Sequence, residues 1–293
     1  ARFDGDKFQF FKTHKNRIVF QPKEKFKSIQ FQEIALSNYN SAEKLIGKKN
    51  LFSTNLTPDW RLIVGLGGES VYETSITLHH IYGIPYIPAS SVKGVVRSYI
   101  INEFFGYPEK RTVPSDELEF PLVNAEYRAF QDEAFCYWFG CPVDIEKVKF
   151  ENNRPKTRIS SGKEKYITEN QKTKLYEIWK QQEKKFSGHK GIITFFDAFP
   201  LDLSEKSIKV DIMNPHYGDY YNKEDKAPTD FLSPNPIPFL SVENTEFQFI
   251  IGSKKEPLDN YEIGDKTIEI WLKEALEQHG IGAKTAVGYG RMK

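Results

Sequence analysis

The segment after Pro88 has the apolar spacing of a helix. In SSVKGVVRSYI, apolar side chains recur at i, i+3, i+4, i+7 and i+8, which places them on one face of a helix. Ser90 or Ser91 can cap its start, because a serine hydroxyl accepts a hydrogen bond from a free amide. The pattern therefore predicts an amphipathic helix that starts near Ser90 and buries one stripe. The stripe consists of Val92, Val95, Val96, Tyr99 and Ile100.

Other apolar runs predict two further helices and a set of strands. One helix is expected from about Gln32 to Ile46, ended by Gly47, and another from about Thr267 to His279. β-branched and aromatic residues in partial alternation are typical of strands. Such residues fill the segments 59–66, 71–88, 191–201, 207–215 and 239–253.

The order of these elements predicts an α+β fold. Strand, helix, strands, helix and a final glycine-rich segment match a ferredoxin-like or RRM-like βαββαβ antiparallel sheet with its helices on one face. A large, mostly helical insertion over about 106–190 follows the first helix, with segments near 124–139 and 168–186. We expect a basic N-terminal segment, 1–50, with a helix packed on the core, and a single domain over 51–293.

Charge is balanced over the whole chain but not along it. The 41 Lys and Arg residues nearly equal the 40 Asp and Glu residues, so net charge alone does not indicate a nucleic-acid binder. Residues 1–30 hold eight basic and three acidic residues, and residues 147–190 hold thirteen and five. This segregation predicts a basic face on a balanced body. The plain alternative is a set of lysine-rich helices that are only solvated.

Composition argues against a metal site and a membrane span. The two cysteines, Cys136 and Cys141, have a C-x4-C spacing that does not match a zinc site, and we expect no metal and no cofactor. No apolar run reaches the roughly eighteen residues of a membrane span, and the first residues lack the apolar core of a signal peptide. We expect a cytoplasmic protein without a membrane partner.

The last fourteen residues, GIGAKTAVGYGRMK, indicate a binding loop. Four glycines, two lysines and an arginine occur there without an acidic residue, so the backbone can approach a polyanion closely under local positive charge. A nucleotide-binding P-loop is excluded, because that motif has glycine directly before its Lys-Thr pair and this chain has Ala283. A frayed tail after a helix cap is the plain alternative.

A second phosphate-binding element is expected at the start of the helix 90–100. Lys93 and Arg97 are four residues apart, off the apolar stripe, and Gly94 between them has no side chain. A helix N-terminus offers free amides and a positive dipole end. Two cations and a glycine beside it would make a seat for phosphates, unless they form only a solvated helix face.

Two motifs together resemble a known family. IPYIPASSVKGVVR, residues 84–97, resembles the P-x-I-P-G-S-S-x-K-G-x-x-R segment of the repeat-associated (RAMP) proteins of CRISPR systems, and GIGAKTAVGYGRM resembles their C-terminal glycine-rich loop. DIMNPHYGDYY, residues 211–221, resembles a subunit of the type III-B (Cmr) effector complex. The resemblance is carried by residues 62–97, 211–221 and 280–292, and Ala89 stands where the family commonly has glycine.

This resemblance implies a non-catalytic RNA-binding subunit that acts in antiviral defence. Such a subunit holds the guide RNA backbone near its 3′ end, caps a filament of related backbone subunits and meets target RNA only indirectly. The positions that match the family motifs would contact RNA. They are Ser90, Ser91, Lys93, Gly94, Arg97, Gly282, Lys284, Gly288, Tyr289, Gly290 and Arg291. In the long loop 216–238, candidates for base stacking or structural hydrogen bonds are His216, Tyr217, Tyr220 and Tyr221.

Cleavage of target RNA is not expected. Related backbone subunits cut RNA with an aspartate in the loop after an I-G-G turn. The matching stretch here, LGGESVYET over residues 66–74, holds Glu69 and Glu73 but no aspartate. The longer glutamate side chain would misplace a metal whose site is set by aspartate.

Two other functions stay open. A metal-free CRISPR endoribonuclease that processes guide RNA would need a histidine that titrates near neutral pH, and His79, His80 and His216 are the candidates. His79 and His80 are expected in a strand, where at most one of them faces any site. A scaffold that contacts only protein is the other alternative, but it does not require two motifs that combine glycine with cations.

Overall fold

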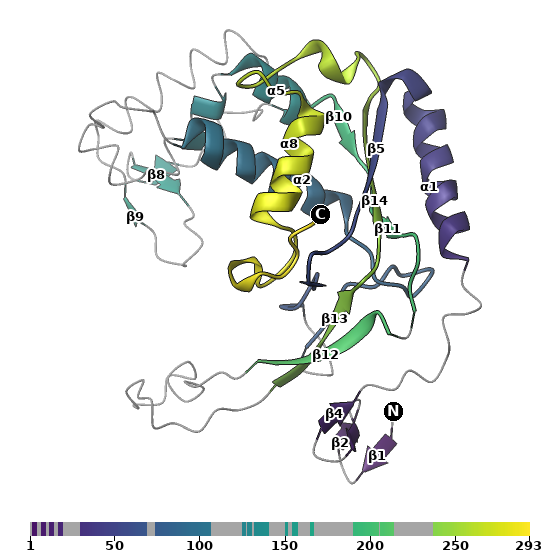
Figure 1. Cartoon of the computed structure of the whole chain (residues 1–293). Helices are drawn as coiled ribbons and strands as arrows, with labels where there is room; N and C mark the ends of the chain where they lie inside the picture. Colours follow the sequence, from purple (N-terminus) through teal and green to yellow (C-terminus); the bar gives the residue numbers. More distant parts are fainter. Residues whose placement is uncertain are drawn as a thin grey trace.

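The fold is described from a computed structural model of the chain (Figure 1). The structure describes residues 30–68, 74–106, 190–204, 206–213 and 237–293, together with 125–126, 128–130 and 132–140. Short strands outside these ranges are described by their backbone alone. They are β1 (Arg2–Asp4), β2 (Lys7–Gln9), β3 (Lys12–His14), β4 (Arg17–Val19), β7 (Phe150–Glu151), β8 (Arg154–Thr157) and β9 (Lys165–Tyr166), paired antiparallel as β1–β2, β3–β4 and β7–β8–β9.

The centre of the molecule is an antiparallel sheet built around β14 (Phe247–Ser253). β5 (Leu51–Leu56) pairs with one edge of β14, and β10 (Ile193–Phe195) and β11 (Phe199–Pro200) pair with the other edge. Because helices cover both faces of the sheet at this strand, β14 carries an almost continuous run of buried side chains.

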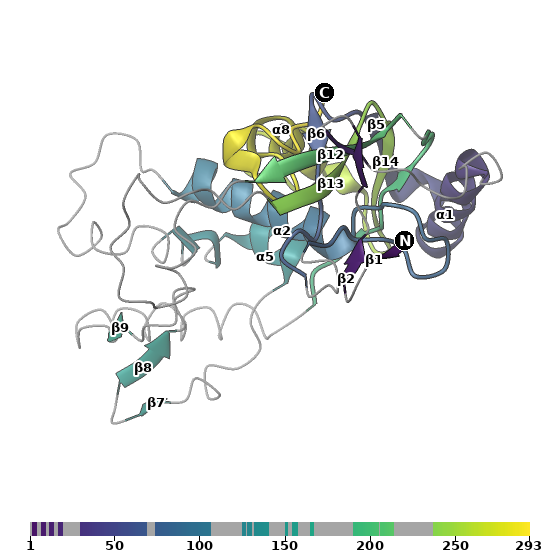
Figure 2. The same cartoon turned by 90° about the horizontal axis from the view of Figure 1, so that it is seen from below.

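A second sheet continues from the first. β13 (Ile237–Glu243) leads into β14 through a turn in which Asn244 has a φ of 50°. β13 also pairs with β12 (Ile208–Met213) and with β6 (Arg61–Leu62). Seen from below, β6, β12 and β13 lie side by side, next to the C-terminus of the chain (Figure 2).

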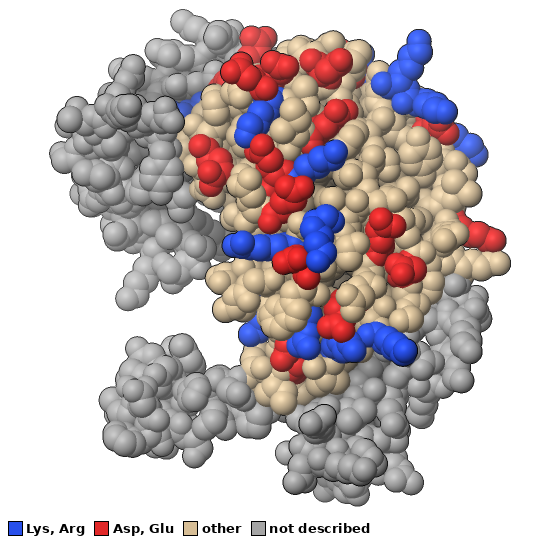
Figure 3. Space-filling model, viewed as in Figure 1, with Lys and Arg blue, Asp and Glu red and all other residues tan. Residues whose placement is uncertain are grey.

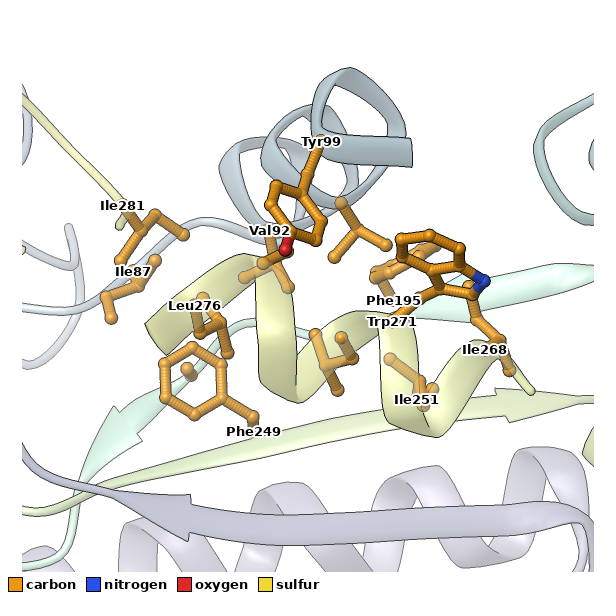
Figure 4. Packing of buried hydrophobic residues seen from close by; sticks show 14 of the residues in the cluster. Ile87, Val92, Tyr99, Phe195, Phe249, Ile251, Ile268, Trp271, Leu276 and Ile281 are labelled. Atoms are coloured by element: carbon orange, nitrogen blue, oxygen red, sulfur yellow. The ribbon is translucent and has the colours of Figure 1, made fainter. Parts of the chain in front are cut away.

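Two helices cover one face of the central sheet. α2 (Ala89–Ile100) continues into a π-helical turn, η3 (Ile101–Phe105), and α8 (Ile268–Glu274) continues into another, η6 (Ala275–His279). Side chains of both helices meet above Phe249 and Ile251 of β14 (Figure 4). The predicted helices near 90–100 and 267–279 are therefore confirmed. The buried stripe of α2 consists of Val92, Val96, Tyr99 and Ile100, with Val95 partly buried against it.

A third helix covers the opposite face, so the expectation of helices on one face only was incomplete. α1 (Phe31–Ile46) packs on β14, β11 and β5 (Figure 1) through Phe31, Ala35, Ala42 and Ile46. RRM domains stack RNA bases on aromatic residues of their open sheet face. In this chain α1 covers that face over β14, β11 and β5, so the face is not open for base stacking.

One helix of the predicted insertion is described, α5 (Glu133–Phe139). The carboxylate of Asp132 caps it by accepting a 2.8 Å hydrogen bond from the amide of Phe135. α5 packs on the core, with the rings of Phe139 and Phe195 6.2 Å apart. Because β7, β8 and β9 also fall between 106 and 190, the insertion is not purely helical. The predicted helix 168–186 and residues 216–236 of the predicted loop 216–238 lie outside the described residues, and the last two residues of that loop begin β13.

The strand predictions were wrong in detail. Residues 59–66 form a strand only at β6. β5 was missed, because its sequence LFSTNL has three apolar residues that do not alternate with polar ones. The run 239–253 is two strands, separated by the turn at Asn244. Within 71–88, the described part makes only the isolated bridges Leu78–Pro85 and Ile87–Ala198. Short 3-10 turns complete the described structure at η2 (Lys48–Asn50), η5 (Leu258–Asn260) and η7 (Thr285–Val287).

Candidate nucleic-acid interface

The C-terminal residues 280–293, here called the glycine segment, are bonded along the link between β5 and β6. The amide of Gly290 donates to the carbonyl of Arg61 at 2.7 Å, and the amide of Asp59 donates to the carbonyl of Arg291 at 2.7 Å. The amide of Ala283 donates to the carbonyl of Ile63 at 2.8 Å. The segment is therefore an ordered part of the fold, and the alternative of a frayed tail does not apply.

The glycines of this segment have different roles. A Cβ on Gly282 would lie 2.2 Å from the Ile63 oxygen, and one on Gly290 would lie 1.9 Å from the Ile281 oxygen. Gly288 has a φ of 94° and no atom within 4 Å of a would-be Cβ. Close backbone approach, which we predicted toward RNA, occurs at Gly282 and Gly290 toward the protein itself. Gly288 alone of these three leaves open space for a ligand.

A polar cluster joins the glycine segment to the β12–β13 hairpin. The carboxylate of Asp211 accepts hydrogen bonds from the Arg61 guanidinium and the Tyr289 hydroxyl. Arg61 Nε also lies 3.4 Å from Glu243 Oε2, and Lys209 Nζ lies 3.1 Å from Glu243 Oε1. Because these residues come from β6, β12, β13 and the glycine segment, the cluster fixes four elements at one place.

The cluster shifts the pKa of each of its central members. Burial, followed by the hydrogen bond to Asp211, raises the pKa of Tyr289 to about 12. Burial alone would raise the pKa of Asp211, but the bonds from Tyr289 and the Ile212 amide and the charge of Arg61 hold it below its usual value. Burial would lower the pKa of Arg61, but Asp211 more than offsets this effect and raises it.

These shifts predict a pH dependence of stability at alkaline pH. Because the folded protein binds the Tyr289 proton more tightly than the unfolded chain, the stabilisation is complete below pH 10 and is lost between pH 10 and about pH 12. The variant Tyr289→Phe should lose less stability over that range than the wild type. Urea unfolding at closely spaced pH values measures the difference, and parallel curves for the two proteins would contradict the prediction.

Three aromatic rings form a row, with Tyr289 of the glycine segment in the middle. The ring of Tyr289 lies 4.8 Å from that of Trp60 and 6.1 Å from that of Phe239. A cation sits at each end of the row, with Arg61 Cζ 4.9 Å from the Trp60 ring and Lys284 Nζ 5.3 Å from the Phe239 ring. Tyr289 is only 5% exposed, so its ring supports the segment from within and offers no open face to a base.

Two cations of the glycine segment stand apart from the acidic side chains. Lys293 pairs with Asp59 at 3.0 Å, but Lys284 and Arg291 make no ion pair within the part of the chain that the structure describes. Arg291 is exposed, and the Lys284 backbone is left-handed, with a φ of 62°. On the face seen in Figure 3, basic and acidic side chains are interspersed. The predicted basic face would draw on segments outside the described residues and stays a prediction.

The start of α2 is capped by a tertiary contact. The amide of Ala89 donates a 2.7 Å hydrogen bond to the carboxylate of Asp197, which follows β10. The cap predicted at Ser90 or Ser91 was therefore wrong, and Pro88 is the N-cap residue. Ser90 and Gly94 are exposed and Ser91 is partly exposed, so all three are accessible to a ligand. A carboxylate already satisfies the first amide of this helix.

The two cations of α2 turn toward the insertion. Lys93 Nζ donates to the carbonyl of Phe139 at 3.2 Å, and burial, then the charges of Arg97 and Lys190, lower the Lys93 pKa. Arg97 pairs with Glu126 and lies over the Phe130 ring, 5.4 Å from its centroid. These contacts order both side chains and leave less of their charge for a phosphate. The sequence could not indicate them, because their partners lie in the insertion.

The two motifs meet in the core. Ile281 at the root of the glycine segment lies beside Ile87 and Val92 at the start of α2 (Figure 4). The hydrophobic core therefore links the two motifs that the sequence singled out. The assignment of all eleven RNA-contact residues stays a prediction.

The adjacent histidines do not lie in a strand. The His79 amide donates to the Ile84 carbonyl at 2.8 Å within a tight turn, and the rings of His79 and His80 stack with centroids 4.9 Å apart. The expectation that they point to opposite faces was wrong, because residues 79–82 turn instead of extending. Burial, then the charge of His80, lowers the pKa of His79, whose buried Nδ1 has no hydrogen-bond partner among the described residues.

Several other candidates fall outside the described residues: Glu69, Glu73, Cys141, His216, Tyr217, Tyr220 and Tyr221. Among the residues that are described, no group of three or more His, Cys, Asp or Glu side chains could hold a metal ion. No helix in the described ranges is long and apolar enough to span a membrane. Cys136 is buried, and its thiol donates to the Phe130 carbonyl at 3.2 Å.

The chain combines an α+β core, a C-terminal glycine segment bonded to that core, and two cations without an ion pair among the described residues. The sequence model of the RAMP superfamily matches residues 55–293, and the chain belongs to that superfamily. It is 35% identical over 244 residues to the CRISPR system Cmr subunit Cmr6 of Pyrococcus furiosus, a match that covers 79% of this chain and 64% of the relative. The chain thus spans about 64% of the length of this curated relative.

Two solved structures are also similar. The crystal structure of Cmr6 from Pyrococcus furiosus shares 29% identity, covering 83% of this chain and 97% of that one, with a TM-score of 0.39. A chain in the cryo-EM structure of the type III-B Cmr-beta complex bound to cognate target RNA shares 18% identity, covering 90% of this chain and 66% of that one, with a TM-score of 0.49.

Proposed function

We propose that this chain is a non-catalytic, RNA-binding subunit of a type III-B CRISPR (Cmr) ribonucleoprotein complex. In this role it holds the guide RNA backbone near its 3′ end and caps the filament of related subunits, in contact with other Cmr subunits and only indirectly with target RNA. Membership of the RAMP superfamily and similarity to a Cmr6 subunit support the proposal. Absence of aspartate from residues 66–74 supports a subunit that does not cleave RNA.

We also propose that the core is a ferredoxin-like βαββαβ unit. The strand order β5, β14 and then β10 with β11, covered by α2 and α8, supports it. The fourth strand would be the end of the glycine segment. Thr57 and Lys293 exchange backbone hydrogen bonds of 3.0 and 2.9 Å there, beside the end of β5.

The observation that carries the RNA-binding role is the pair of available cations on a rigid backbone. Lys284 and Arg291 belong to a segment whose amides and carbonyls are bonded to β6 and its link to β5. Both lack an acidic partner among the described residues. Phosphate contacts need positive charge held in place, and contact with a protein neighbour alone does not require it.

The test is the binding of full-length protein to single-stranded RNA over a salt series. The double variant Lys284→Ala, Arg291→Ala should reduce the slope of log affinity against log salt by about 1.4, since each phosphate contact on a single strand contributes about 0.7. Lys93→Ala should have a smaller effect, because Lys93 already donates to Phe139.

The matched control is Lys254→Ala, Lys255→Ala. These exposed lysines follow the far end of β14, so their removal changes the net charge equally without touching the glycine segment. If both double variants behave like the wild type, alone and in the reconstituted complex, the proposed RNA-binding role is wrong. Loss of a measured RNA cleavage activity in His79→Ala or His80→Ala would favour the endoribonuclease instead.

A further inference from the structure

Trp60 is an exposed aromatic residue held rigidly beside the backbone of Arg291, at the end of the aromatic row opposite to Lys284. Its side chain is 48% exposed, although a tryptophan gains more than most residues from burial. Folding alone does not explain why so large an apolar group stays at the surface. Nothing in the sequence pattern marked this residue, because it stands in a short apolar run that predicts a strand.

The backbone on both sides of Trp60 is fixed by the glycine segment. The Asp59 amide donates to the Arg291 carbonyl and the Arg61 carbonyl accepts from the Gly290 amide, each at 2.7 Å. Trp60 thus lies between two hydrogen bonds that tie it to this segment. A side chain on so constrained a backbone loses little conformational freedom when it binds a ligand.

The ring of Trp60 is also oriented by its neighbours. Tyr289 contacts it at a tilt of 57°, with the centroids 4.8 Å apart, and Arg61 Cζ lies 4.9 Å from its centroid. Asp211 in turn holds both Tyr289 and Arg61. The cluster that joins the hairpin to the glycine segment therefore also fixes the plane of the exposed indole.

The charges around Trp60 favour a nucleic acid over an apolar protein surface. Arg61, Lys209 and Lys293 are paired with Asp211, Glu243 and Asp59. Among the described residues of this surface, Lys284 and Arg291 therefore remain as the cations without an ion pair. An aromatic plane beside available cations is the usual arrangement for binding single strands, where bases stack and phosphates meet the charges.

We propose that Trp60 stacks on a base of the bound single-stranded RNA while Lys284 and Arg291 contact the neighbouring phosphates. This inference rests on the proposed function and extends it by assigning a base contact to a site otherwise made of backbone contacts. Every base has a π face, so the stack tolerates any sequence. The site would therefore hold the guide RNA without reading it.

The experiment compares two ligands of equal length and charge, oligo(U) and the corresponding abasic ribose-phosphate oligomer, on full-length protein. Trp60→Leu should weaken oligo(U) binding about 5- to 150-fold, the range for loss of one base stack, without changing the salt slope. Trp60→Phe should retain most of the affinity, since it keeps an aromatic face. On the abasic oligomer, wild type and Trp60→Leu should bind equally.

Other outcomes overturn the inference and are distinct from failure of the proposed function. Equal oligo(U) affinity of Trp60→Leu and the wild type, or an equal loss on the abasic oligomer, means that Trp60 does not stack on a base. Normal RNA binding with failed entry into the reconstituted complex makes Trp60 a protein contact. In each case the proposed function still stands if the double variant Lys284→Ala, Arg291→Ala weakens binding to both ligands. If the double variant weakens binding to neither ligand, the proposed function and the inference about Trp60 are both wrong.

Discussion

Replacing Gly290 with alanine is expected to lower the free energy of unfolding by about 3–5 kcal/mol. The residue has a φ of 71°, and its new Cβ would lie 1.9 Å from the Ile281 oxygen. Left-handed backbone at a residue other than glycine costs about 1–3 kcal/mol. Relief of the clash would also break two hydrogen bonds, one that the Gly290 amide donates to the Arg61 carbonyl and one that the Gly290 carbonyl accepts from the Ile281 amide, each worth about 1 kcal/mol.

The control for this prediction is Gly288→Ala in the same segment. Gly288 has a similarly left-handed φ of 94°, but its Cβ would meet nothing within 4 Å. Its cost should be limited to backbone strain, about 1–2 kcal/mol. Urea unfolding of the two variants measures the difference. Equal decreases in the free energy of unfolding would contradict the prediction. They would show that the backbone near Gly290 moves away from the new Cβ without losing its hydrogen bonds.

The contrast between these two glycines shows what the sequence could and could not predict. Four glycines after a helix predicted close backbone approach, and at Gly282 and Gly290 that approach is made to the protein itself, not to the polyanion that we expected. The pattern does not say which atoms come close. At Gly282 and Gly290 the neighbours are carbonyls of Ile63 and Ile281, and the first of these is more than two hundred residues away in the chain.

Local periodicity was sufficient for the helices and insufficient for the strands. The stripe of α2 repeats every 3.6 residues within the helix itself, so its bounds could be predicted from Val92, Val96 and Ile100. β5 is stabilised by pairing with β14, whose residue Phe249 lies opposite Thr54. Because that partner is far away in the chain, the sequence LFSTNL, half of it polar and without alternation, carries little sign of a strand.

The site was predictable as a pair of motifs but not as a charge distribution. Lys93 and Arg97 carry the family motif, yet Phe139 and Glu126 of the insertion engage them. Lys284 and Arg291 carry a plainer signal and have no such partner among the described residues. Tertiary contacts decide which cations remain without a partner. The cations of the glycine segment are therefore better candidates for phosphate contacts than those of α2.

Removal of the Asp211 carboxylate is expected to cause the second large loss of stability. Asp211→Ala should lower the free energy of unfolding by about 2–3 kcal/mol, because it leaves the Tyr289 hydroxyl buried without its acceptor and Arg61 with Glu243 alone. Breaking a fully buried ion pair costs about 3–5 kcal/mol. The Asp211 side chain is 24% exposed, so water compensates part of the loss and the expected value is lower.

The same substitution should weaken RNA binding. Asp211 lies on β12, and through Tyr289 and Arg61 it positions the glycine segment and the Trp60 ring. An affinity loss at unchanged salt slope, measured well below the unfolding transition, would show that the number of phosphate contacts is kept while their geometry is degraded. A loss of stability with full RNA affinity would limit the cluster to a structural role.

Two controls separate the contribution of the shared carboxylate from that of charge alone. Asp59→Ala removes an exposed pair with Lys293, in which both side chains are 64% exposed, and should change stability by less than about 1 kcal/mol. In the double variant Asp211→Ala, Tyr289→Phe the orphaned hydroxyl is gone, so its destabilisation should be smaller than the sum of the two single effects. Strict additivity would mean that Asp211 and Tyr289 act independently, and the coupling of the hairpin to the glycine segment would then have to run through Arg61 and Glu243.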